Sequence, residues 1–74
     1  MNIQNMIADI QHAIEEDTLR GYNTKLLRKA LKQYKKAYDY CAQCYKSPRY
    51  VRLTGNAIER GNRYVECYRN SGKQ

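Results

Sequence analysis

The sequence predicts an all-α domain of three helices, in which a short N-terminal helix precedes a long antiparallel helical hairpin. Apolar residues recur at helical spacing in three separate segments. Turn and capping residues stand between those segments. No alternation of apolar and polar residues is long enough for a sheet. Because the chain has 74 residues, we expect one domain over residues 1–74, with a small core.

The first helix is expected over about residues 3–16. Its apolar side comprises Ile3, Met6, Ile7, Ile10, Ala13 and Ile14. The other side is polar, as in an amphipathic helix that covers a core. Gly21 then predicts a turn, and Asn23 with Thr24 predicts the N-cap of the next helix.

The second helix is expected over about residues 24–46 and the third over about residues 48–69, with a short tail at 70–74. Ser47 and Pro48 are a capping residue followed by proline at the first helical position. So short a connection makes the two long helices antiparallel neighbours. The apolar side of the third helix comprises Tyr50, Val51, Leu53, Ala57, Ile58, Tyr64, Val65 and Tyr68.

Positive charges form one row on each long helix. Stepped at about 100° per residue, those of the second helix fall within a sector of roughly 120°. This lysine row comprises Lys25, Arg28, Lys29, Lys32, Lys35, Lys36 and Lys46. The arginine row of the third helix comprises Arg49, Arg52, Arg60 and Arg63. Only Asp39 interrupts the lysine row, whose charges repel one another unless an anion lies along them.

The net charge of +7 conceals a division along the chain. Residues 1–17 carry four acidic side chains and no Lys or Arg, whereas residues 18–74 carry all 14 Lys and Arg against three acidic side chains. Such a division can draw copies together, and self-association commonly stabilises small domains, so we expect a homo-oligomer. No secretion signal or run of about 20 apolar residues is present. We therefore expect a cytoplasmic protein with reduced thiols and no membrane partner.

Few residues indicate chemistry, and we expect no catalytic residue, metal site or cofactor. The sequence has one histidine, no glycine-rich phosphate loop and no paired carboxylates on a shared apolar face. His12 falls on the polar side of its helix and is expected to be solvated. Cys41 and Cys44 fall on the apolar side and are expected to be small buried hydrophobes. Cys67 lies beside the arginines, as either a reactive thiol or an incidental exposed one.

All eight aromatic residues are tyrosines. A buried tyrosine needs a hydrogen-bond partner for its hydroxyl group. Core or subunit-interface positions are expected for Tyr34, Tyr38, Tyr45, Tyr64 and Tyr68. Tyr40 falls at the edge of the lysine row, where it either stacks on a base or is an ordinary boundary residue. Tyr22 is a second candidate for stacking.

Two glycines interrupt the third helix, at a cost of about 1 kcal/mol each relative to alanine. They are Gly55 and Gly61, and Gly61 projects from the apolar side. Either a partner helix or ligand approaches closely at Gly61, or the helix merely tolerates it.

The two basic rows predict binding of a phosphate-rich ligand, either nucleic acid or a nucleotide. The expected contacts are Lys25, Arg28, Lys29, Lys32, Lys36, Arg49, Arg52, Arg60 and Arg63. The alternative for each row is an ordinary solvated surface. Whether both rows border one groove depends on the packing angle of the helices, which the sequence does not determine.

A second hypothesis is a non-catalytic inhibitor from a phage or mobile element that uses the same surface against an acidic host protein. Phage-borne inhibitors, including anti-CRISPR proteins, have this small size, and the comparison rests on scale alone. The order of a short helix, a loop and two long helices joined at a tight serine-containing turn also resembles the phage sponges that sequester cyclic oligonucleotides in anti-CBASS defence evasion. Ser47 and the pair Leu53 and Thr54 match that pattern. The resemblance implies a helical oligomer that binds cyclic nucleotides, without a ligand-binding motif to transfer.

Overall fold

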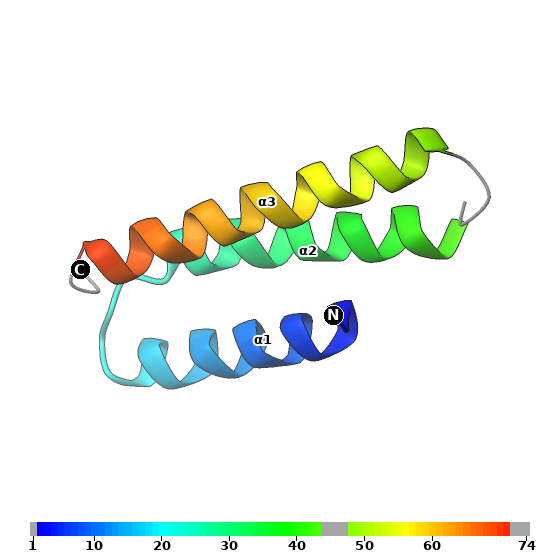
Figure 1. Ribbon diagram of the computed structural model, residues 1–74. Helices are drawn as coiled ribbons and strands as arrows, with labels where there is room; N and C mark the ends of the chain where they lie inside the picture. Colours follow the sequence, from blue (N-terminus) through cyan, green and yellow to red (C-terminus); the bar gives the residue numbers. More distant parts are fainter. Residues whose placement is uncertain (1, 44–47, 72–74) are drawn as a thin grey trace.

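The computed structural model describes residues 2–43 and 48–71. These residues form three helices, α1 (Ile3–Leu19), α2 (Lys25–Gln43) and α3 (Pro48–Asn70), and contain no strand (Figure 1). The all-α, three-helix prediction is therefore confirmed. The molecule is elongated, with extents of 43 × 19 × 17 Å.

The antiparallel hairpin of α2 and α3 is the framework of the molecule, and α1 packs beside α2 (Figure 1). The core lies mainly between the two long helices. Its buried apolar residues are Leu27, Ala30, Tyr34, Ala37, Ala57 and Tyr68. Small alanines on the facing sides allow the two helices to lie close together.

The two long helices approach each other closely at Gly61. A Cβ atom added there would lie 2.5 Å from Cε1 of Tyr34 on α2. Gly61 is itself buried. The sequence left open whether this glycine marks a close approach or a tolerated irregularity, and the structure shows a close approach of the neighbouring helix. Gly55, in contrast, has open space around it.

The helix α1 continues to Leu19, three residues beyond the expected end near residue 16. Gly21 adopts a φ of 85°, a conformation that glycine enters without a steric cost. The backbone N–H of Gly21 donates to the carbonyl of Thr18, and that of Tyr22 donates to the carbonyl of Asp17. This pair of hydrogen bonds is the Schellman arrangement that closes a helix at a glycine. The glycine, rather than the last apolar residue of the pattern, thus determines where α1 ends.

Both predicted starts of the long helices are observed at or next to the expected residue. The side chain of Asn23 accepts a hydrogen bond from the backbone N–H of Lys25, and the carbonyl of Thr24 accepts the first intrahelical bond of α2. Pro48 is the first residue of α3. The expected end of the second helix at Lys46 and the cap at Ser47 lie outside the described residues, as do Cys44, Tyr45 and the last residues of the tail.

The two buried tyrosines have the hydroxyl partners that the sequence requires. The hydroxyl of Tyr34 donates to Oδ1 of Asn62 over 2.6 Å, and that of Tyr68 donates to Oδ2 of buried Asp17 over 2.5 Å. The latter bond joins α1 to α3. Burial and this hydrogen bond raise the pKa of Tyr68 to about 12. Burial also raises the pKa of Tyr34, against the opposing charge of Arg69.

Two residues assigned to apolar faces, Val51 and Cys41, are exposed, and Val51 is 63% exposed. Tyr38, expected in the core or at a subunit interface, is also exposed and so does not belong to the core of the single chain. Because α1 is shorter than the hairpin, its N-terminus stops short of the end at which α3 begins (Figure 1). Cys41 and Tyr38 line a shallow hollow with the first residues of α1 instead of packing beneath it. The prediction of Cys41 as a buried hydrophobe is therefore wrong.

Candidate anion-binding face

All nine predicted phosphate-contact residues are exposed. They are Lys25, Arg28, Lys29, Lys32 and Lys36 on α2, and Arg49, Arg52, Arg60 and Arg63 on α3. Helix α1 covers none of them, so both rows are open to a ligand. Lys46, the remaining member of the lysine row, lies outside the described residues.

Two contacts across the hairpin place part of each basic row on one side of it. Nζ of Lys29 lies 5.9 Å from the centroid of the Tyr64 ring on α3. Arg60 precedes Tyr64 by one helical turn, so it lies beside the same ring. Near the other end of the hairpin, the rings of Tyr40 and Tyr50 approach with centroids 6.0 Å apart and planes tilted by 51°. The sequence left open whether both rows border one groove, and these contacts bring only part of each row to the same side of the hairpin.

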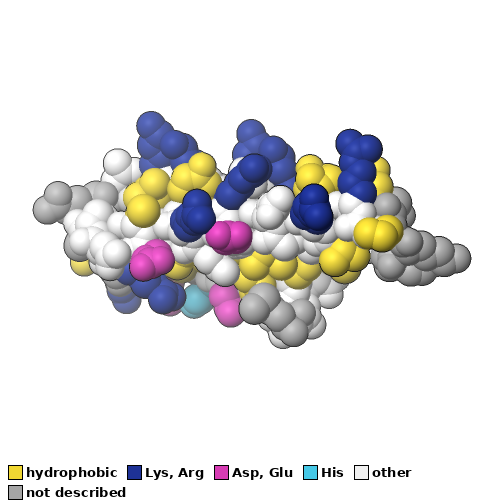
Figure 2. Space-filling model, turned by 45° about the horizontal axis from the view of Figure 1, so that its top comes forward, with side chains coloured by type: hydrophobic (Ala, Val, Ile, Leu, Met, Phe, Trp, Pro, Cys, Tyr) yellow, Lys and Arg dark blue, Asp and Glu magenta, His cyan; other side chains and the backbone are white. Residues whose placement is uncertain are grey.

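We define the basic face as this side of the hairpin. The basic face comprises Lys25, Lys29, Lys32 and Lys36 of α2 with Arg49 and Arg60 of α3. Figure 2 shows Lys and Arg side chains along the length of the hairpin, with apolar side chains exposed between them. The half-buried rings of Tyr40, Tyr50 and Tyr64 lie between the two basic rows.

The short helix α1 lies on the other side of the hairpin. The side-chain amide of Gln4 on α1 donates to the hydroxyl of Tyr38 on α2. At about 100° per residue, Tyr38 lies on the side of α2 opposite to Lys29 and Lys36. Leu27 lines a hollow together with residues of α1. The carboxylates of α1 therefore do not neutralise the basic face within the same chain.

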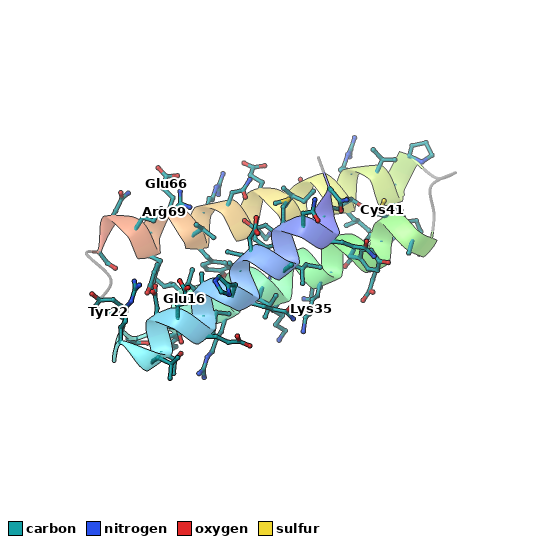
Figure 3. All side chains as sticks on the ribbon, turned by 90° about the horizontal axis from the view of Figure 1, so that it is seen from below. Glu16, Tyr22, Lys35, Cys41, Glu66 and Arg69 are labelled. Atoms are coloured by element: carbon teal, nitrogen blue, oxygen red, sulfur yellow. The ribbon has the colours of Figure 1, made fainter. Side chains whose placement is uncertain are left out.

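Other members of the rows stand apart from the basic face. Arg28 lines a hollow with Leu19 and other residues of α1. Lys35 also lies on the side of α2 away from α3 (Figure 3). Arg63 donates to Oε1 of Glu59 over 2.9 Å in an exposed ion pair. These residues are available for binding but do not border the tyrosines.

The two predicted stacking residues are not brought together. Tyr40 is half-buried on the basic face, as the sequence led us to expect of a boundary position. Tyr22 precedes the start of α2, at the opposite end of that helix from Tyr40, and is 40% exposed (Figure 3). The structure therefore keeps Tyr40 as a candidate for stacking beside the basic rows and separates Tyr22 from it.

Titratable groups elsewhere form no clustered site within the described residues. His12 is exposed, and its Nε2 lies 2.9 Å from Oε1 of Glu16, as expected of a solvated histidine. Over residues 2–43 and 48–71, no three His, Cys, Asp or Glu side chains are grouped so that they could hold a metal ion. Cys67 is exposed one helical turn from Tyr64. No helix in this part of the chain has the length and apolar character needed to cross a membrane.

Comparisons of the chain with models of protein families, with curated proteins and with solved structures give no match.

Tyr50 and Tyr64 border the basic face but were assigned from sequence to the apolar side of the third helix. On a helical projection, Tyr64 falls between the buried Ala57 and the exposed Arg60, so a boundary role was visible in the pattern. The position of Tyr50 depends on its contact with Tyr40, which only the packing of the two helices reveals.

Proposed function

We propose that this protein binds a phosphate-rich ligand, nucleic acid or nucleotide, through its basic face, and that it acts by binding rather than by catalysis. The contact of Lys29 with Tyr64 carries this proposal, because it joins the lysine row to the arginine helix on one open side. Ion pairs among the described residues involve His12, Arg20 and Arg63. The six cations of the basic face have no carboxylate within ion-pair distance in that part of the chain, so an external anion would relieve their repulsion.

The proposal predicts a strong dependence of affinity on salt. If all six cations of the basic face neutralise phosphates, the slope of log affinity against log salt is about −5 for a duplex and about −4 for a single strand. An ordinary solvated surface would give a slope near zero, because no counterions are released in a specific complex.

A matched pair of double variants tests where the ligand binds. Lys29→Gln with Lys36→Gln removes two charges from the basic face, whereas Arg28→Gln with Lys35→Gln removes two charges from the α1 edge of the same helix. Fluorescence anisotropy of labelled oligonucleotides over a salt series measures the slope for each. We expect the first pair to reduce the slope by about 1.5 to 2 and the second pair to leave it nearly unchanged. Equal effects of the two pairs would place binding elsewhere.

The same titration should include cyclic di- and trinucleotides, the ligands implied by the resemblance to phage sponges. Binding of these alone would make the ligand a nucleotide rather than a polymer. Absence of salt-dependent binding to every nucleic acid and nucleotide tested would refute the proposal. An acidic protein retained after nuclease treatment would then be the remaining ligand for the basic face, as an inhibitor would require. Self-association stays a prediction, which the mass from light scattering tests.

A further inference from the structure

We infer that the basic face takes single-stranded nucleic acid, with bases stacked on Tyr64 and on the Tyr40 and Tyr50 pair and with phosphates held by the flanking cations. This inference rests on the proposed function and specifies its ligand. It follows from the position of aromatic rings between two basic rows, because proteins that bind single strands combine a positively charged track with aromatic platforms.

The three tyrosines are placed to offer ring surface to a ligand. Each of these tyrosines is half-buried, so each keeps part of its side chain exposed while the protein holds the rest. The rings of Tyr40 and Tyr50 contact each other across the hairpin, with centroids 6.0 Å apart. This contact limits how far either ring has to reorient when a base binds. Rings fixed in this way lose little conformational freedom when a base stacks on them.

The contact of Lys29 with Tyr64 does not block stacking there. At 5.9 Å the ammonium lies at the outer limit of a cation–π interaction, and such a contact at an exposed site is weak. A base that stacks on Tyr64 would displace the ammonium of Lys29 from the ring. The ammonium would then remain within reach of the phosphate of that nucleotide. The same lysine thus contributes to the free and the bound state.

The distance between the stacking tyrosines, Tyr50 and Tyr64, sets the length of single strand that the basic face can bind. A helical rise of about 1.5 Å per residue puts Tyr50 and Tyr64 about 21 Å apart along α3. Successive nucleotides of a stacked strand are about 3.4 Å apart, so the two platforms span about six nucleotides. The cations of α2 and α3 flank this interval on both sides.

Duplex nucleic acid fits the basic face less well. The major groove of B-DNA is about 12 Å wide and admits one helix. The basic face extends over two helices packed side by side, whose axes are normally separated by 8–10 Å before side chains are added. It would therefore meet a duplex across the phosphate ridges, with the tyrosines left without bases to contact.

Binding of the unmodified protein to four oligomers of about 12 nucleotides separates stacking from charge. The oligomers are a thymidine DNA strand, a uridine RNA strand, an abasic DNA strand of the same charge, and a DNA duplex. We expect the DNA strand, the RNA strand or both to bind at least tenfold more tightly than the abasic strand and the duplex. A series of shorter strands should gain affinity steeply up to about six nucleotides. An abasic strand or duplex that binds as tightly as the single strands would overturn the inference and leave the proposed function standing. No binding to any oligomer would also overturn the inference and would restrict the proposed function to a nucleotide, whereas no binding to any oligomer or nucleotide would refute both.

Tyrosine variants locate the platform. Tyr64→Leu and Tyr40→Leu should each weaken single-strand binding about tenfold, whereas Tyr64→Phe and Tyr40→Phe retain the ring and should bind normally. Tyr38→Leu is the matched control, because Tyr38 is a partly exposed tyrosine on the α1 side of the same helix. Loss of binding in Tyr38→Leu equal to that in Tyr64→Leu would count against the platform. Helical circular dichroism of each variant reports whether it is folded, and the comparison with the abasic strand does not depend on any variant.

Discussion

Replacing Gly61 with alanine should destabilise the protein, although alanine is the better helix former by about 1 kcal/mol. The added methyl group would meet three ring carbons of Tyr34, at 2.5, 2.8 and 2.9 Å. These distances are shorter than van der Waals contact, so the ring must move. The ring is 3% exposed and its hydroxyl is held by Asn62, which leaves it little room. Overpacking of this kind costs about 2 to 3 kcal/mol, so the net loss of stability is about 1 to 2 kcal/mol.

Gly55 provides a matched control in the same helix. An added Cβ atom at Gly55 meets nothing within 4 Å. The Gly55→Ala variant should therefore gain most of the helix-propensity difference and be more stable by about 0.5 to 1 kcal/mol. The two substitutions are chemically identical and differ only in what lies opposite them.

Thermal and urea unfolding followed by far-ultraviolet circular dichroism would measure both effects. For a domain of this size, 1 kcal/mol corresponds to a shift of roughly 4–8 °C in Tm, so the variants should shift in opposite directions by a readily measured amount. Combining Gly61→Ala with Tyr34→Leu should cost less than the sum of the single variants, because the smaller side chain makes room for the methyl group. Equal stabilisation by Gly61→Ala and Gly55→Ala would refute the close approach of α2 and α3 at this position.

Four further predictions concern the core and the basic face. Tyr68→Phe should lower the free energy of unfolding by about 2 kcal/mol in urea unfolding, because it leaves the buried carboxylate of Asp17 without its hydroxyl donor. Since the pKa of Tyr68 is raised to about 12, the folded state keeps a proton that the unfolded state loses above about pH 10. Wild-type stability should consequently fall between pH 10 and 12 more steeply than that of Tyr68→Phe, and parallel curves would contradict this. Gln33→Leu should raise stability by about 1 kcal/mol on thermal unfolding, because the side-chain oxygen of Gln33 is buried with no hydrogen-bond partner among the described residues. A bound single strand should slow alkylation of Cys67, measured site by site by mass spectrometry, and leave that of Cys41 unchanged; equal protection of both thiols would argue against binding at the basic face.

The sequence pattern within each segment was sufficient to predict the three helices, because each segment has its own apolar periodicity and its own capping or turn residues. Pro48 begins α3 as its residue type predicts, and the capping pair Asn23 and Thr24 begins α2. The apolar pattern of the first helix stops at Ile14, so the predicted end near residue 16 is too early. The helix continues through Asp17, which is buried and accepts a hydrogen bond from Tyr68. A pattern that equates burial with apolar character does not predict the burial of a polar residue that has a buried hydrogen-bond partner.

Errors in the assignment of faces have a different origin. Val51 and Cys41 were assigned to apolar faces, but both are exposed. The first residues of α1 only border Cys41 across a shallow hollow and do not pack over it. The basic rows themselves were predictable as rows, because exposure of a charged side chain needs no tertiary information. Their convergence on one side was not predictable, since it depends on the rotation of each helix about its axis, which the Lys29 and Tyr64 contact reveals.

The position of α1 opposite the basic face gives the molecule a second side of mixed charge. That side carries the exposed carboxylates of Asp9, Glu15 and Glu16 together with the exposed cations Arg20, Arg28 and Lys35. A copy held to a nucleic acid by its basic face turns this mixed surface outward. Beyond the Debye length, about 8 Å at physiological salt, neighbouring charges of opposite sign present almost no net field to a second polyanion. One copy should therefore not bridge two strands.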